Sequence, residues 1–146
     1  MRPARPPREP AVPSDAPAPL LVLAQDDSWH SRFQVTSLAA SAAAAGQPVA
    51  VAFFFAALAA WAGGRWDDAE PEPPVPVERL EALGLPPLSS MLDDGRRRGL
   101  VTLYACSAST RILGLSPEAV QARVDAIAGW PTFHRLIRQA ERVVSL

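Results

Sequence analysis

The stretch LVTLYACSASTRILG, residues 100–114, decides the fold class. Its first six residues are rich in β-branched, aromatic and other apolar side chains, which predicts a strand buried in a sheet. Residues 107–113 then read as a short helix that Gly114 ends. The sequence therefore predicts a strand that passes directly into a helix, with Cys106 at the junction.

Similar apolar runs occur at residues 20–24 and 49–55, and the chain closes with a fourth at residues 142–146. A helix rich in Ala is expected at about residues 30–45, between the first two runs. Strands that alternate with helices and are apolar on both faces predict an α/β fold. We expect a three-layer α/β/α domain with a mostly parallel sheet of about four to five strands.

The remaining segments predict helices at about residues 77–83, 87–98 and 131–140. Another helix is expected to start at Ser116, with Pro117 as its first residue, and to continue to Gly129. Its apolar stripe would consist of three residues at helical spacing. These residues are Val120, Val124 and Ile127.

Two segments are expected to lie outside the packed domain. Residues 1–18 are rich in proline and have little apolar periodicity, so we expect a disordered tail before a domain at residues 19–146. Residues 65–76 contain four acidic residues and four prolines. They predict a long, mobile loop.

Composition excludes several classes of protein. The formal net charge is −1 and all 14 basic residues are Arg, which gives no general attraction to nucleic acid or anionic membrane. Residues 33–64 carry no charge, but Gly46-Gln47-Pro48 divides them into pieces too short to span a bilayer. A single cysteine excludes an internal disulfide and a zinc site with several thiolates. A cytoplasmic, reducing compartment is expected.

Cys106 is the main candidate for chemistry, because the carboxyl ends of parallel strands are where ligand sites gather. A thiol reacts as the thiolate, and the unpaired N–H groups at a helix start favour that form. Ser107 and Ser109 are expected to cap the helix and to orient the sulfur. The alternative is that Cys106 only packs, since free cysteines are among the most buried residues.

Other polar residues are weaker candidates. His30 and His134 are the only residues that could form a Cys–His pair with Cys106, and no ligand spacing predicts a metal or cofactor. Asp26 and Asp27 follow the first strand, where they would cap the next helix or form a polar rim beside Cys106.

Trp61, Trp66 and Trp130 exceed what a core of this size needs. Trp61 and Trp66 flank a glycine turn, which predicts partner contact or lid packing.

Residues 104–115 resemble the active-cysteine segment of the DsrE family of sulfur-relay proteins, particularly its TusD branch. In that family a strand ends in Cys and a Gly closes the next helix eight positions later, as Cys106 and Gly114 do here. Residues 46–55 and 140–146 are similar to further parts of the family, so the resemblance covers about residues 20–146. Some relatives carry a second Cys three positions on, where this chain has Ser109.

The resemblance implies a persulfide carrier that accepts sulfur on Cys106 and passes it to a partner, and thus a sulfurtransferase function. It also implies homo- or hetero-oligomers of the trimer or hexamer type, with sulfur donor and acceptor proteins as partners. The alternative is a non-catalytic, oligomeric binding or assembly module on the same fold. An enzyme for small molecules ranks last, because neither a phosphate-binding loop motif nor a hydrolase elbow motif is present.

Overall fold

The computed structural model describes residues 17–69 and 77–146. The prediction of a disordered tail therefore concerns residues that lie almost wholly outside the described part, as do residues 70–76 of the acidic segment. None of the described helices is long and apolar enough to cross a membrane.

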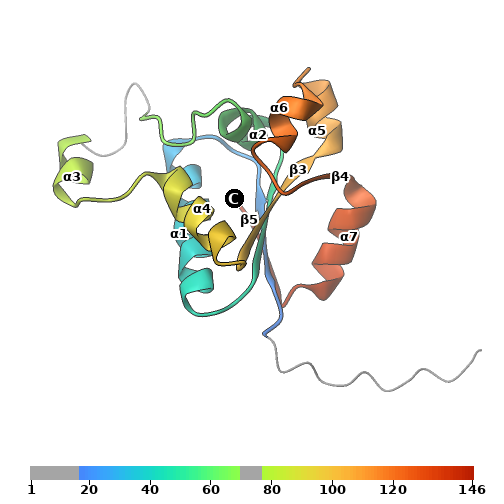
Figure 1. The fold of residues 1–146 in the computed structure, drawn as a ribbon, viewed down its shortest axis with the longest axis horizontal. Coiled ribbons are helices and arrows are strands. Elements are labelled where there is room, and N and C mark those ends of the chain that lie inside the picture. Colours follow the sequence, from blue (N-terminus) through green and yellow to red (C-terminus); the bar gives the residue numbers. More distant parts are fainter. Residues whose placement is uncertain (1–16, 70–76) are drawn as a thin grey trace, which may run out of the picture.

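The centre of the fold is one sheet of five strands that are all parallel, in the order β4-β3-β2-β1-β5 (Figure 1). Its strands are β1 (Leu20–Ala24), β2 (Val49–Phe53), β3 (Val101–Cys106), β4 (Ala126–Ala128) and β5 (Arg142–Ser145). Ala24 pairs with Phe53, and Phe53 with Ala105. This register brings the carboxyl ends of the three central strands to one edge, and it confirms the predicted α/β class.

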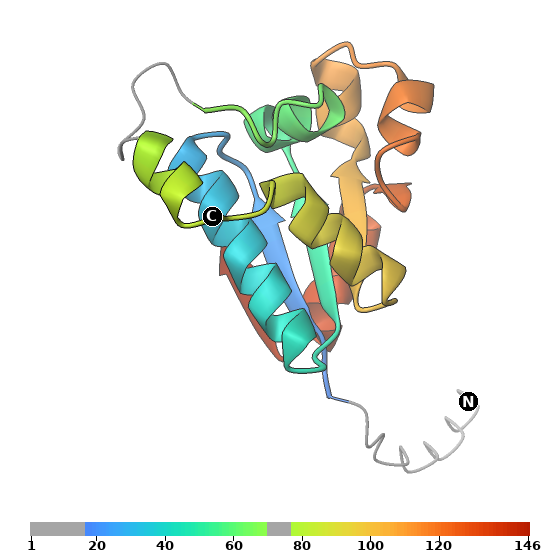
Figure 2. The same ribbon diagram turned by 60° about the vertical axis from the view of Figure 1, so that its left-hand side comes forward.

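Seven helices connect these strands within the described residues. They are α1 (Trp29–Ala44), α2 (Phe55–Ala62), α3 (Val77–Ala82), α4 (Leu88–Arg97), α5 (Ser107–Ile112), α6 (Pro117–Gln121) and α7 (Trp130–Gln139). Helices α1 and α4 lie side by side on one face of the sheet, and α7 lies on the other (Figures 1 and 2). This arrangement is the predicted three-layer α/β/α sandwich.

The two faces of the sheet have cores of different size. The larger core lies under α1, α2 and α4 and contains Val22, Val51, Leu58, Leu92 and Leu103. Helix α4 approaches β3 so closely that a Cβ on Gly95 would lie 2.4 Å from Val101 Cγ2. The smaller core lies under α7 and consists of Ala52, Phe54, Cys106, Ala128 and Phe133.

The predicted helix from Ser116 to Gly129 is wrong in its second half. Helix α6 ends at Gln121, and Ile127 belongs to strand β4. Asp125 explains the change: its carboxylate accepts the N–H of Leu103 at 2.7 Å, and its own N–H donates to the Leu103 carbonyl at 2.9 Å. These bonds, together with the ladder to β3, give partners to backbone groups on the edge of β3, which a continued helix would leave without them.

Of the two roles expected for Trp61 and Trp66, partner contact is wrong, because their exposed fractions are 2% and 1%. Both indoles contact the ring of Phe53, each at 5.2 Å between ring centroids. Burial is tolerated because each indole N–H has an acceptor: Trp61 donates to the Arg123 carbonyl, and Trp66 donates to Thr36 Oγ1.

A buried arginine, which sequence patterns gave no reason to expect, anchors the segment after α2. Arg32 is 4% exposed, and its guanidinium donates to the carbonyl oxygens of Asp27, Arg65, Trp66 and Asp68 at 2.7–3.2 Å. The predicted mobility of residues 65–76 therefore does not fit their described beginning, which is held to α1 by this side chain.

Candidate functional site

The candidate site lies where β3 meets α5. Cys106 is the last residue of β3 and also the N-cap of α5, with extended backbone angles (φ −68°, ψ 123°). The backbone N–H of Ser109 donates to Cys106 Sγ at 3.5 Å. The expectation that Ser107 or Ser109 caps this helix is therefore wrong, since the thiol itself is the cap. Gly114, at φ 65°, lies in the turn after the helix as expected.

The thiol lies inside the protein, in a core that contains two phenylalanine rings, and a tryptophan contacts both of these rings. Cys106 is 2% exposed and packs in the smaller core with Phe54 and Phe133. The ring of Phe54 lies 5.1 Å from that of Phe133 and 5.5 Å from that of Trp130, while Trp130 and Phe133 are 5.8 Å apart. We call these three rings the aromatic cover. Its outer member, Trp130, is 54% exposed.

Ser109, three residues after Cys106, carries a buried hydroxyl group that has no hydrogen-bond partner in the described structure. The residue is fully buried, and its hydroxyl has no hydrogen-bond partner within the described parts of the chain. Buried hydroxyls without a partner are uncommon, because each loses its bonds to water without replacement. The same residue thus holds Cys106 Sγ through its N–H and keeps a hydroxyl unused.

The backbone next to the aromatic cover is strained. Phe55, which follows Phe54 and begins α2, has φ 39°, and it is the one non-glycine residue with positive φ in the described chain. Positive φ brings the side chain of a bulky residue close to its own backbone. Such strain collects at sites that bind or change conformation, and here it lies at the carboxyl end of β2.

Asp26 supports the start of α1 and makes no described hydrogen bond to the cysteine site. Ser28 is the N-cap of α1 and accepts the N–H of Ser31. The Asp26 carboxylate accepts the hydroxyls of both serines. These bonds hold the pKa of Asp26 below its ordinary value, with the Ser28 hydroxyl as the largest cause. The expectation that Asp26 or Asp27 caps α1 is therefore wrong, since Ser28 is the N-cap and Asp26 supports it through the serine hydroxyls.

The two histidines do not pair with Cys106 in the described structure. His30 is an exposed residue in the first turn of α1, with its ring 6.3 Å from that of Trp29. His134 is exposed on α7, in a hollow formed with Arg135 and Arg138. Within residues 17–69 and 77–146, neither histidine forms a hydrogen bond with the thiol.

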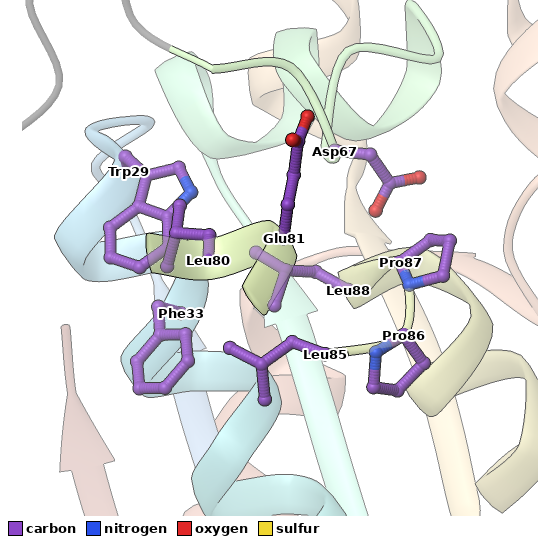
Figure 3. A pocket seen from close by; sticks show the side chains of 9 residues that line it. All are labelled: Trp29, Phe33, Asp67, Leu80, Glu81, Leu85, Pro86, Pro87 and Leu88. Carbon is purple, nitrogen blue, oxygen red and sulfur yellow. The ribbon is translucent and has the colours of Figure 1, made fainter. Parts of the chain in front are cut away.

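A separate hollow of about 260 Å³ lies beside α1 (Figure 3). Trp29 and Phe33, whose rings stack at 5.1 Å, form one wall, and Leu80, Leu85 and Leu88 contribute most of the remaining apolar surface. Its lining contains no Cys, His or Ser. This hollow therefore offers apolar contact but no thiol, hydroxyl or imidazole.

Asp67 and Glu81 provide the acidic groups of the same hollow, and their carboxylates lie toward one end of it in Figure 3. The Asp67 carboxylate is already engaged, because it accepts both the N–H and the hydroxyl of Ser89 at the start of α4. Across residues 17–69 and 77–146, no three His, Cys, Asp or Glu side chains are grouped so that they could hold a metal ion.

No protein-family model matches this chain, and no curated protein matches its sequence. The chemistry of the site must therefore be argued from its geometry.

Proposed function

We propose that this protein is a sulfur carrier of the DsrE type, which accepts sulfur on Cys106 as a persulfide and passes it to a partner. The observation that carries the proposal is the position of the thiol. It lies at the carboxyl end of a parallel strand, and its sulfur accepts a backbone N–H at the start of a helix.

The reaction needs no outside oxidant. The Cys106 thiolate attacks the outer sulfur of a donor persulfide, forms a new S–S bond, and releases the donor cysteine as a thiolate. In the second step a partner thiolate attacks the outer sulfur on Cys106, and Cys106 leaves as a thiolate. The chain has no second cysteine, so the accepting thiol belongs to another chain.

Burial requires that the site opens before either step. Attack on sulfur demands access in line with the S–S bond, and a cysteine that is 2% exposed does not offer it. Trp130 is the exposed member of the aromatic cover, and the strained backbone at Phe55 adjoins Phe54. We expect opening to separate Trp130 from the two inner rings and to relieve that strain.

The unused hydroxyl of Ser109 supports a sulfur-bound form of the site. A persulfide adds a polarisable sulfur atom, which accepts a hydrogen bond weakly. Ser109 has a buried O–H without a partner in the described chain, on the residue whose N–H contacts Sγ. It would supply the donor that the added sulfur needs.

The proposal also covers assembly and location. A carrier with one thiol depends on other chains, so we propose homo- or hetero-oligomers that include sulfur donor and acceptor proteins. Because free cysteines persist where thiols are kept reduced, we propose a cytoplasmic location.

The test is incubation with a cysteine desulfurase and cysteine, followed by mass spectrometry of the intact protein. We expect a gain of one sulfur atom in the native chain and none in Cys106→Ser. In Ser109→Ala we expect loading to persist but the persulfide to decay faster. A native protein that gains no sulfur, and whose thiol resists iodoacetamide at neutral pH, would overturn the proposal.

One observation favours a second function, a non-catalytic assembly module: Cys106 is packed in a core. The two functions differ in the response to Cys106→Ala. An assembly module would keep its cellular function in this variant, while a sulfur carrier would lose it. Because Trp61 and Trp66 are buried, the exposed Trp130 and Ile137 are the residues to replace in a test of assembly.

A further inference from the structure

Helix α7 presents a basic face to solvent. Phe133 is buried against the sheet and Leu136 packs beside it, which turns the opposite side of the helix outward (Figure 1). That side carries three exposed basic residues, which we call the basic stripe: His134, Arg135 and Arg138. Together with Gln139 they line a shallow hollow of about 320 Å³. No acidic residue occurs within α7 itself.

Within the described residues the two arginines of the stripe make no ion pair, unlike the three arginines at the end of α4. At the end of α4, Arg96 pairs with Asp93 at 3.0 Å and with Asp125 at 2.9 Å, and its two neighbours both pair with Asp94. Over the described residues, neither Arg135 nor Arg138 makes an ion pair or a hydrogen bond. Like charges three positions apart on a helix repel each other, and an anion bound between them would relieve that repulsion.

Two exposed apolar residues lie on the same helix as the stripe. Trp130 is 54% exposed and Ile137 36%. Exposed aromatic side chains beside arginine are the composition that interface centres favour. The combination therefore indicates a surface that binds protein rather than one that is merely solvated.

The basic stripe lies on the helix that also carries part of the aromatic cover. Trp130 is the first residue of α7 and belongs to the aromatic cover, whose inner rings share a core with Cys106. A segment that lies along α7 therefore ends at the cover. A ligand that extends to this end of α7 would contact Trp130, the residue whose movement we expect to open access to the thiol.

We infer that the outward face of α7 is the docking surface for an acidic polypeptide segment of the protein that exchanges sulfur with Cys106. The inference rests on the proposed function, since it names the partner's chemistry at the same site. An acidic polypeptide fits better than a nucleic acid, because three basic side chains on one helix of a chain with net charge −1 are a small patch.

The test compares two synthetic acceptor peptides that each contain one cysteine. One peptide has glutamates along its length, and the other has glutamines at the same positions. The peptide thiolate attacks the outer sulfur of the Cys106 persulfide, so that the peptide becomes the persulfide and Cys106 leaves as a thiolate. We expect the glutamate peptide to react about three- to tenfold faster at low ionic strength, and the advantage to vanish in high salt.

The variant Arg135→Glu/Arg138→Glu should remove this advantage, whereas Arg79→Glu, which reverses a charge on the exposed surface of α3, should retain it. Loading of sulfur from a small uncharged donor should be equal in all three proteins. Equal rates for both peptides in the native protein would overturn the inference, and so would an equal loss in Arg79→Glu.

A binding measurement separates this inference from the proposed function. Fluorescence anisotropy with labelled peptides that carry Ser in place of Cys reports docking without any sulfur chemistry. Suppose that Cys106 gains no sulfur, but the native protein binds the glutamate peptide and the double variant does not. The docking surface is then supported and the carrier function is contradicted. Tighter binding of a single-stranded RNA oligonucleotide than of the glutamate peptide would overturn the inference.

Discussion

Replacing Trp130 by Ala should expose the Cys106 thiol by a predictable factor. Trp130 contacts Phe54 at 5.5 Å and Phe133 at 5.8 Å between ring centroids, and such pairs each contribute about 0.5–1.5 kcal/mol. If opening of the site breaks both contacts, the variant opens at a cost lower by about 1–3 kcal/mol. This difference corresponds to an increase of about 5- to 150-fold in the population of the open form.

The assay is alkylation of Cys106 by iodoacetamide at a fixed pH, with Cys106→Ser as the blank. When closing is faster than alkylation, the rate follows the open population, so the same factor should appear in the rate. Trp29→Ala is the matched control, because it removes a ring stacked on Phe33 at 5.1 Å, away from the cysteine. Denaturant unfolding of both variants corrects for any change in global stability.

An equal acceleration in Trp29→Ala and Trp130→Ala would refute the reasoning, since access would then depend on general loosening. An unchanged rate in Trp130→Ala would refute it as well, because the aromatic cover would not control access.

Two further predictions concern stability. Arg32→Met leaves the backbone carbonyls of Trp66 and Asp68 without their donor. We therefore expect urea titration to show a loss of about 3 kcal/mol in the free energy of unfolding. A loss below about 1 kcal/mol would contradict the anchoring role of Arg32. Asp26→Asn should lower stability at neutral pH but not in acid. Hydroxyls of Ser28 and Ser31 hold the pKa of Asp26 in the folded protein below its ordinary value. The stabilisation from the ionised carboxylate is therefore complete above the ordinary pKa, and it is lost as the pH falls through the lower pKa of the folded state. Unfolding measured in steps from pH 7 to below about pH 4 should show native and variant converge, and a constant difference would count against this account.

The local pattern was sufficient for the strands of the sheet interior. Residues 20–24, 49–53 and 101–106 are apolar on both faces, and only a sheet covered on both sides satisfies such runs. Strand β4 was not predicted, because its three residues, Ala126–Ala128, fit the apolar stripe of a helix as well as they fit a strand. Its conformation depends on the free edge of β3 and on the bonds between Asp125 and Leu103, which link residues far apart in the chain.

Burial of polar and aromatic side chains was beyond the local pattern for a similar reason. An arginine in a helix predicts an exposed side chain, yet Arg32 is buried because carbonyls of a distant loop surround it. Trp61 and Trp66 have indole N–H groups whose acceptors lie on other elements, so nothing nearby in the chain shows that they can be buried.

For the cysteine itself, the amino-acid sequence alone determined that the only thiol of the chain ends a buried strand and begins a helix. That conclusion depends on nearest neighbours, and backbone geometry at such a junction follows from them. Only the tertiary structure decided that Cys106 is 2% exposed and lies beside rings from two other elements. Access to a thiol depends on what packs around it. The parallel pairing of strands and the position of α7 on the sheet bring Phe54 and Phe133 into the core with Cys106, and Trp130 onto those two rings.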